Sequence, residues 1–401
     1  MKAVVALSRA EAPARLDGLL LLLLAALAAL GALATNIILP SFPRMAGDLG
    51  TSVKDLSATL ASFFIAFALG QLLVGPLSDR FGRRWLVLGG LAVFVVGSVI
   101  CAVSGSLSQL IVGRTVQALG VCATSVLSRA IARDLFDGEA LARALALIMV
   151  AMAAAPGFSP LLGGALGELT GWRATFWLLA LLAVALAVLY ATRLGETHAA
   201  NRRSAVSPVA VAGTYVQLLG DRRFIAPAVS VSCVIGSLYM FFAMAPAILM
   251  AGFGFSALGL ALFFASTVFV VFGAGFLAPR WARRKGQTYV ARAGIAIALA
   301  GAVALWAGQY NVYAFAVAMT VFLLGMGLLN PLGTAIALQP FGHQAGAASA
   351  LLGFLQMGCA ALSIAVAAAL PLTVYAAFCT VLTVNLVCAL IAFTGPDMRG
   401  A

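Results

Sequence analysis

The sequence predicts an all-α membrane protein with twelve transmembrane helices in two six-helix bundles and both termini in the cytoplasm. Three observations predict this fold. Of the 401 residues, 63% are hydrophobic and only 9% are charged, a balance that excludes an ordinary water-exposed surface. Apolar segments of spanning length recur along the chain, and one long polar stretch divides them into equal halves. The lipid bilayer is therefore the first partner that we expect.

The spans are placed by length, because about 20 apolar residues cross the hydrocarbon core. In the first half they lie at about 18–39, 53–76, 86–104, 107–128, 142–166 and 173–193. In the second half they lie at about 224–250, 256–278, 288–308, 312–337, 345–369 and 371–394. We therefore expect an N-terminal bundle over 1–193, a cytoplasmic linker over 194–223 and a C-terminal bundle over 224–401.

The 24 Lys and Arg residues predict the orientation. If the N-terminus is cytoplasmic, twenty of them face the cytoplasm, while Arg44, Lys54 and Arg173 lie outside and Arg114 lies within a span. The formal charge of +12 does not indicate nucleic-acid binding, because the basic residues form short clusters between apolar runs. They are better explained as topology determinants.

The reactive side chains do not form a catalytic or metal site. All six cysteines fall inside apolar segments without a CxxC pair or a neighbouring histidine, so we expect them to be packing residues. We expect no metal, no cofactor and no enzymatic activity.

One polar motif recurs. GPLSDRFGRR at 75–84 carries Asp79, Arg80, Arg83 and Arg84, and we place it in a short cytoplasmic turn between spans 2 and 3. It returns 200 residues later as GFLAPRWARR, with Pro279 in place of the acid. Two halves that each carry this turn after their second span indicate a transporter built from parallel repeats.

These residues resemble the major facilitator superfamily over essentially the whole chain. GPLSDRFGRR resembles its signature between spans 2 and 3, and LIVGRTVQALG resembles its fourth-span motif, with Arg114 inside the membrane and Gln117 three residues on.

APGFSPLLGG at 155–164 resembles the fifth-span motif of drug antiporters, with Ala155 and Ser159 where glycines are usual. The motif residues that match are Pro156, Pro160, Gly163 and Gly164.

The segments SRAIARDLFDG, GWRATFW and PFGHQAGAASALLGFLQMG are similar to the bicyclomycin and chloramphenicol resistance (Bcr/CflA) branch of the drug:proton antiporters. The resemblance implies a multi-pass protein of the bacterial inner membrane that exports drugs in exchange for protons. It also implies an Asp near the end of span 1, where TNIILPSFP has Asn36 instead.

Arg114 is the leading candidate for a substrate contact, since a charged side chain at a helix centre costs about 2.5–3.5 kcal/mol on insertion scales. Asn36 lies near the outer end of span 1, where the two residues could meet. The alternative is a structural Arg satisfied by backbone carbonyls and Gln117. Because no acidic residue lies mid-span, we expect neutral or zwitterionic compounds to be preferred over lipophilic cations.

The second half offers further cavity candidates in Tyr239, Phe242 and Asn330. Tyr239 and Phe242 precede Pro246 in span 7, and Asn330 precedes Pro331 in span 10, where the backbone is loosened. Ordinary packing explains the individual aromatic residues equally well.

The resemblance further implies that Asp79 docks against the helix opening at 345–350 when the cytoplasmic side is closed. Unpaired N–H groups at a helix N-terminus attract a carboxylate. We therefore assign Asp79, together with Arg80, Arg83 and Arg84, to the cytoplasmic gate. For the three arginines, a role as topology determinants alone is the competing explanation.

We thus expect a monomeric efflux transporter with a small-molecule substrate and protons as coupling ions. A facilitator or importer of one metabolite on the same fold is the alternative, because fold does not determine function. A non-transporting membrane sensor is less favoured, since no extramembrane domain is available to signal.

Overall fold

The computed structural model describes residues 18–198, 208–308 and 311–394, and every regular element in these ranges is a helix. Twelve of the helices are long and apolar enough to cross a membrane. Only structures with internally paired backbone groups are stable in hydrocarbon, and long apolar sequences achieve this as helices. The predicted all-α fold with twelve spanning helices is confirmed, while the side of the membrane on which the termini lie stays a prediction.

The spans of the first half are α1 (Gly18–Asn36), α3 (Ser57–Phe81), α4 (Arg83–Ala102), α5 (Leu107–Leu135), α6 (Gly138–Leu169) and α7 (Arg173–Arg193). A short 3-10 segment η1 (Leu39–Ser41) and α2 (Phe42–Leu49) follow α1. The spans of the second half are α9 (Arg222–Ala245), α10 (Ala257–Lys285), α11 (Gln287–Leu305), α12 (Val312–Leu338), α13 (Ala345–Ala369) and α14 (Val374–Phe393). Three short segments, η3 (Pro246–Gly252), η4 (Trp306–Gly308) and η5 (Gln339–Gln344), extend α9, α11 and α12, and α8 (Pro208–Gly220) precedes α9.

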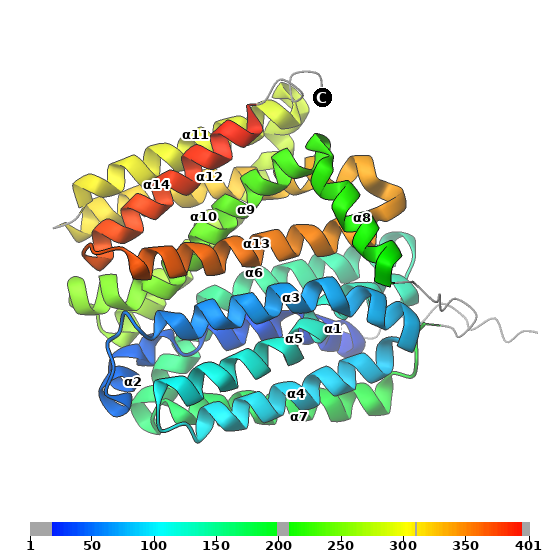
Figure 1. Ribbon diagram of the computed structural model, residues 1–401, viewed down its shortest axis with the longest axis horizontal. Helices are drawn as coiled ribbons and strands as arrows, with labels where there is room; N and C mark the ends of the chain where they lie inside the picture. The colour runs from blue at the N-terminus through cyan, green and yellow to red at the C-terminus, as the bar shows by residue number, and fades with distance from the viewer. Residues whose placement is uncertain (1–17, 199–207, 309–310, 395–401) are drawn as a thin grey trace, which may run out of the picture.

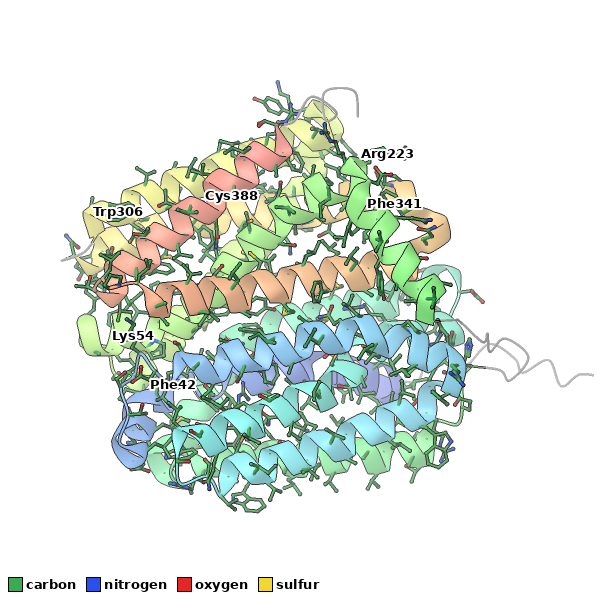
Figure 2. The ribbon with its side chains drawn as sticks, in the orientation of Figure 1. Phe42, Lys54, Arg223, Trp306, Phe341 and Cys388 are labelled. Atoms are coloured by element: carbon green, nitrogen blue, oxygen red, sulfur yellow. The ribbon has the colours of Figure 1, made fainter. Side chains whose placement is uncertain are left out.

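The two sets of spans lie side by side, with α4, α5 and α7 on one flank and α11, α12 and α14 on the other (Figure 1). Between them α3 packs on α13 and α6 packs on α10, and these two helix pairs form the seam between the halves. Phe42 and Lys54 lie at one end of the molecule, and Arg223 and Phe341 lie at the other (Figure 2). Because η1 directly precedes Phe42, we call the first the η1 end. We call the second the Arg83 end, because α3 runs from near Lys54 to this end and α4 begins there at Arg83.

Four spans that begin at the η1 end start on a side-chain cap. Ser106, Ser256, Asn311 and Thr373 each accept a hydrogen bond from a backbone N–H in the first turn of the following helix. Such caps satisfy N–H groups that have no partner inside the helix, and they fix where each span begins.

The charged motif at 75–84 is not a turn, which corrects the sequence prediction. Helix α3 continues through Phe81, and only Gly82, with φ of 93°, interrupts the path before α4 begins at Arg83. This positive φ is open to glycine and strained for other residues. The prediction failed because the apolar pattern ends before the helix does, and charged residues continue a helix that emerges from the bilayer.

The internal repeat is also less regular than its sequence suggests. Gly286, with φ of 88°, breaks the second half as Gly82 breaks the first, but 204 residues later, not 200. Helix α10 therefore carries one additional turn, which holds the exposed residues Arg283, Arg284 and Lys285. The matching arginines of the two motifs consequently occupy different structural positions.

Glycines bring neighbouring spans into close contact within each half. A methyl group at Gly97 of α4 would overlap the backbone of Gln117 in α5, and one at Gly301 of α11 would overlap Phe322 in α12. Small residues allow such backbone approach in membranes, where helices associate through packing. The pair α4–α5 and the pair α11–α12 are thus structural counterparts.

We predict that Gly97→Ala lowers the stability of the protein, because the added methyl group meets backbone that cannot rotate away. Over-packing of this kind costs ~1–3 kcal/mol, which corresponds to a melting temperature several degrees lower in detergent. The matched control is Gly89→Ala on the same helix, where a methyl group would meet nothing within 4 Å. Equal melting temperatures for the two variants would contradict the close contact.

Candidate functional site

The centre of the first half holds a completely buried cation. Arg114 of α5 is 0% exposed and donates one hydrogen bond from Nη1 to the carbonyl oxygen of Ala34 in α1, at 3.0 Å, and another to Oε1 of Gln117. Its guanidinium lies 4.4 Å from the ring centroid of Phe63 in α3. Three helices therefore meet at this side chain.

Gln117 continues the polar contacts into a fourth helix. Its Nε2 donates to Oγ of Ser98 in α4 at 2.8 Å, and the Ser98 hydroxyl donates in turn to the carbonyl oxygen of Phe94. With its nitrogen bonded to Ser98, Gln117 directs its oxygen to Arg114. This is the structural role that the sequence allows for the pair, and it orients the guanidinium.

Asn36 ends α1, two residues beyond the carbonyl that Arg114 binds, and it is 1% exposed. Its Nδ2 donates to the Ala32 carbonyl oxygen at 2.9 Å and to Oγ1 of Thr35 at 3.0 Å. Within the described residues, Asn36 Oδ1 and Arg114 Nε and Nη2 have no hydrogen-bond partner. The structure brings the two predicted residues to the same junction without a direct hydrogen bond between them.

A chain of aromatic rings connects this junction to the second half. From Phe63 the ring contacts pass to Phe64 at 6.0 Å, to Tyr239 of α9 at 4.8 Å and to Phe242 at 6.2 Å between centroids. The contact between Phe64 and Tyr239 crosses the seam. We call Phe63, Phe64, Tyr239 and Phe242 the aromatic path; sequence reasoning missed its first two members.

Asn330 has no hydrogen bond with this group among the described residues. It is half-buried in α12 and forms no hydrogen bond within the described ranges.

A different amide links spans of the second half. Asn385 of α14 donates to Ser237 of α9 at 3.0 Å and to Ser363 of α13 at 2.9 Å. The sequence analysis did not identify Asn385, although it is an isolated amide within an apolar span.

The glycines of the fifth-span motif let α6 pack closely against the segment that follows α1. A methyl group at Gly163 would overlap the carbonyl of Ile37, next to Asn36, and one at Gly164 would lie 3.6 Å from Pro40. Pro160 is buried and Pro156 is half-buried, and both remain inside the helix. The motif therefore lets α6 support the segment that follows Asn36, and it leaves Ser159 Oγ buried without a partner among the described residues.

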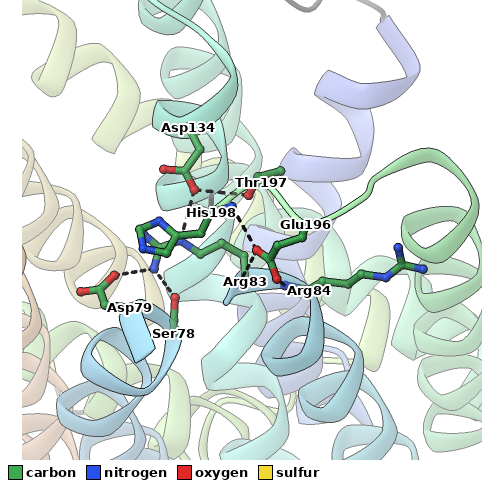
Figure 3. Close-up of polar contacts among 8 residues, drawn as sticks. All are labelled: Ser78, Asp79, Arg83, Arg84, Asp134, Glu196, Thr197 and His198. Carbon is green, nitrogen blue, oxygen red and sulfur yellow. Dashed lines mark hydrogen bonds and ion pairs between the residues drawn. The ribbon is translucent and has the colours of Figure 1, made fainter. Parts of the chain in front are cut away.

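At the Arg83 end, acidic residues from three segments surround one arginine (Figure 3). Arg83 is 8% exposed; its Nη1 donates to Asp79 Oδ1 at 2.6 Å and to the Ser78 hydroxyl, and its Nε donates to Asp134 Oδ2 at 3.2 Å. Asp134, at the end of α5, also accepts a hydrogen bond from Thr197 Oγ1 at 3.2 Å. Arg83 therefore joins the ends of α3 and α5.

Glu196 completes this cluster by capping α4. Its two carboxylate oxygens accept hydrogen bonds from the backbone nitrogens of Arg83 at 2.8 Å and Arg84 at 3.3 Å. A carboxylate is favourable there because the first N–H groups of a helix lack internal partners. Arg84 Nη2 reaches the Ala191 carbonyl at 3.4 Å, whereas Arg80 is exposed and lies over the ring of Phe81.

Asp134 and Glu196 were not predicted as site residues from the sequence, although they stand in the segments SRAIARDLFDG and LGETH. Their charge could have indicated a role, because both acids lie close to the ends of spans that also carry arginines. Their positions are far apart in the chain, so hydropathy alone does not join them.

The seam is closed at the η1 end and open around Asp79. At the η1 end, α2 contacts η3, and η1 contacts both α9 and α10. At the Arg83 end, Ala345 and Gly346 in the first turn of α13 are exposed, and the side chain of Asp79 is 44% exposed and bonded to Arg83. Methyl groups at Gly75 and Gly346 would meet nothing within 4 Å. The structure thus has Asp79 undocked.

Comparison with known proteins covers nearly the whole chain. A family model described as Major Facilitator Superfamily matches residues 24–364. The chloramphenicol resistance protein of Pseudomonas aeruginosa is 34% identical in an alignment of 346 residues, and the match covers 82% of this chain and 79% of that protein. Multidrug resistance protein D of Escherichia coli (strain K12) is 28% identical over 340 residues, or 84% of this chain and 85% of that protein.

Among solved structures, a D-xylose–proton symporter is similar, with a TM-score of 0.76 and 15% sequence identity. The match covers 96% of this chain and 99% of that chain. At this identity the likeness concerns the arrangement of the helices alone.

We predict that Arg83→Ala destabilises the protein, because Asp134, whose side chain is only 19% exposed, loses its ionic partner. The loss of hydrogen bonds to a partly buried charged group costs ~1.5–3 kcal/mol, seen as a lower melting temperature and faster proteolysis. Arg283→Ala, at the exposed position that matches Arg83 in the sequence repeat, is the control and leaves both readouts unchanged. If the two variants have the same melting temperature, the contacts of Arg83 do not stabilise this end of the fold.

Proposed function

The chain belongs to the major facilitator superfamily and is a transporter, not an enzyme; on that premise we propose that it is a secondary active exporter of small amphiphilic compounds, antibiotics included. It works in the bacterial inner membrane by alternating access, with N-terminal and C-terminal bundles moving about the seam. The Arg83 end faces the cytoplasm, because most Lys and Arg residues are expected on that side.

The observation that carries this proposal is the aromatic path. It connects Arg114, in the first half, with Tyr239 and Phe242, in the second, through ring contacts that cross the seam. A site between two moving halves is where a transporter of this architecture binds its substrate. Rings beside a single cation suit a compound with an apolar body and a polar or acidic group. The two relatives with resistance in their names support the drug class.

The site disfavours cations. Arg114 carries a permanent positive charge, and no described acidic side chain lies in the middle of a spanning helix. A cationic drug would meet repulsion in a low-dielectric interior without a compensating carboxylate. Neutral or zwitterionic compounds are therefore the substrates that we propose.

We predict that the wild-type protein, produced in an efflux-deficient bacterium, raises the inhibitory concentration of a neutral antibiotic such as chloramphenicol far more than that of a quaternary ammonium dye. Arg114→Ala lowers transport of the neutral drug at least about tenfold, since one hydrogen bond to a charged group is worth ~1.5–3 kcal/mol. Ser363→Ala, which removes a hydroxyl bonded to Asn385 in the second half, is the control. Equal protection against both compounds would refute the charge preference. No protection against either compound would favour the alternative, a facilitator or importer of one metabolite.

Proton coupling in this chain cannot use a carboxylate at position 36. Two acids in the loops are also poor proton carriers: the Ser52 hydroxyl lowers the pKa of Asp55 below its ordinary value, and Arg223 does the same for Asp221. Both therefore stay ionised near neutral pH. We propose Asp79, Glu168 or Asp17 as the proton-accepting group, or a proton carried by the substrate itself; Asp17 lies outside the described residues.

We predict that adding a neutral substrate to inverted vesicles dissipates a preformed acidic lumen, as antiport requires. Asn36→Asp adds a carboxylate at the Arg114 junction, and it extends this dissipation to a lipophilic cation because the added charge compensates the drug. Asn330→Asp, half-buried and apart from Arg114, does not. An unchanged pH gradient in the wild type would count against antiport, and a cation response in both variants would refute the special position of residue 36.

A further inference from the structure

Helix α8 is an uncharged helix that lies outside the twelve spans. Its sequence, PVAVAGTYVQLLG, contains no Asp, Glu, Lys or Arg. At the Arg83 end it runs steeply across the long helices, passing α13 toward α3 (Figure 1). It is too short to cross a bilayer, so its exposed surface needs an explanation.

The inner face of α8 joins both halves of the protein. Leu218 is 1% exposed and packs in a small core with Phe224, Phe341 and Leu351 of the second half. On the same face, the Tyr215 hydroxyl donates to the carbonyl oxygen of Leu72 in α3, at 3.1 Å. This contact crosses the seam.

The contact with Leu72 also gives the depth of α8. Leu72 lies nine residues before the end of α3 at Phe81. At a rise of 1.5 Å per residue, α8 touches α3 about 13 Å inside the helix end. Around it, Leu69 and Leu73 of α3 are 51% and 60% exposed, as expected for side chains that face lipid. This is the level of the headgroup and acyl boundary, not of bulk water.

The outer face of α8 is an apolar stripe. Val209, Val216 and Leu219 are 80%, 69% and 45% exposed, and Ala212 between them is exposed as well. Their spacing of three, four and three residues places them along one side of a helix. Beyond the helix end, Arg223 is exposed and hydrogen-bonded to Asp221. The depth, the continuity with the exposed leucines of α3 and the adjacent basic residue all favour the same partner.

We propose that α8 is an interfacial helix that docks in the lipid leaflet at the Arg83 end, with its apolar stripe among the acyl chains and Arg223 directed to lipid phosphates. Because its inner face contacts both α13 and α3, the leaflet then holds the element that bridges the seam. Movement of the halves must carry α8 along or break the contact between Tyr215 and Leu72. This inference concerns the membrane placement of one helix and does not depend on which compound is transported.

The test is thiol labelling in proteoliposomes that have been freeze–thawed so that a charged maleimide reaches both faces. Val216→Cys tests the stripe, and Gln217→Cys, exposed on the other flank of the same helix, is the matched control. Peptide mass spectrometry separates these sites from the native cysteines. We expect Val216→Cys to react at least about tenfold more slowly than Gln217→Cys, because charged groups enter the acyl region poorly. In detergent, an uncharged maleimide labels both.

Three outcomes would overturn the proposal. Equal rates for the two variants in proteoliposomes would mean that the stripe faces water. Protection of Val216→Cys that disappears at a high lipid-to-protein ratio would mean that a second copy of the chain covers it. Protection in native membranes but not in proteoliposomes of the purified protein would mean that another protein does. None of these readouts involves drug transport, so they are independent of the proposed function.

Discussion

The burial of the Arg114 charge is the constraint on which the first half of the structure depends. A guanidinium inside a membrane protein must be compensated, and here the compensation consists of a backbone carbonyl from α1 and the Gln117 oxygen. Gln117 is in turn held by Ser98 of α4, so α4 must approach α5 closely. Gly97 permits that approach, because its α-carbon faces the backbone of Gln117. One charge thereby specifies how three helices are arranged.

The second half has different polar contacts at the corresponding motif, although its helices follow the same plan. There the motif arginines stand on an additional exposed turn of α10, and Pro279 occupies the place of the acid. In the first half, by contrast, Arg83 is enclosed by Asp79 and Asp134. The first half is thus stabilised at the Arg83 end by ionic contacts, and the second half relies on packing and on hydroxyl contacts such as those of Asn385. The duplicated sequence therefore produces halves with different polar anchors.

Hydropathy predicted the number of spans because lipid imposes length and composition on every helix. The direction of the spans also placed Asn36 and Arg114 at one junction, and helical spacing paired Arg114 with Gln117. What the sequence could not predict were contacts set by packing. Phe64 meets Tyr239 only because the halves associate, and Glu196 caps α4 only after α7 returns beside it. The motif at 75–84 was misjudged because a hydropathy minimum marks the edge of the bilayer, not the end of a helix.

The Arg83 cluster is compatible with closure of the seam at the same end. Arg83 donates to Asp79 Oδ1, whereas Oδ2 accepts no hydrogen bond among the described residues. A carboxylate offers about four acceptor positions, so Asp79 can keep Arg83 while Oδ2 receives N–H groups from the first turn of α13. In the structure Arg83 holds the Asp79 carboxylate through Oδ1 and leaves Oδ2 toward the seam without a partner among the described residues. The docking of Asp79 on α13 that the sequence predicts therefore requires no exchange of ion pairs, only a closer approach of α3 and α13 near Gly75 and Gly346, where a methyl group now meets nothing within 4 Å.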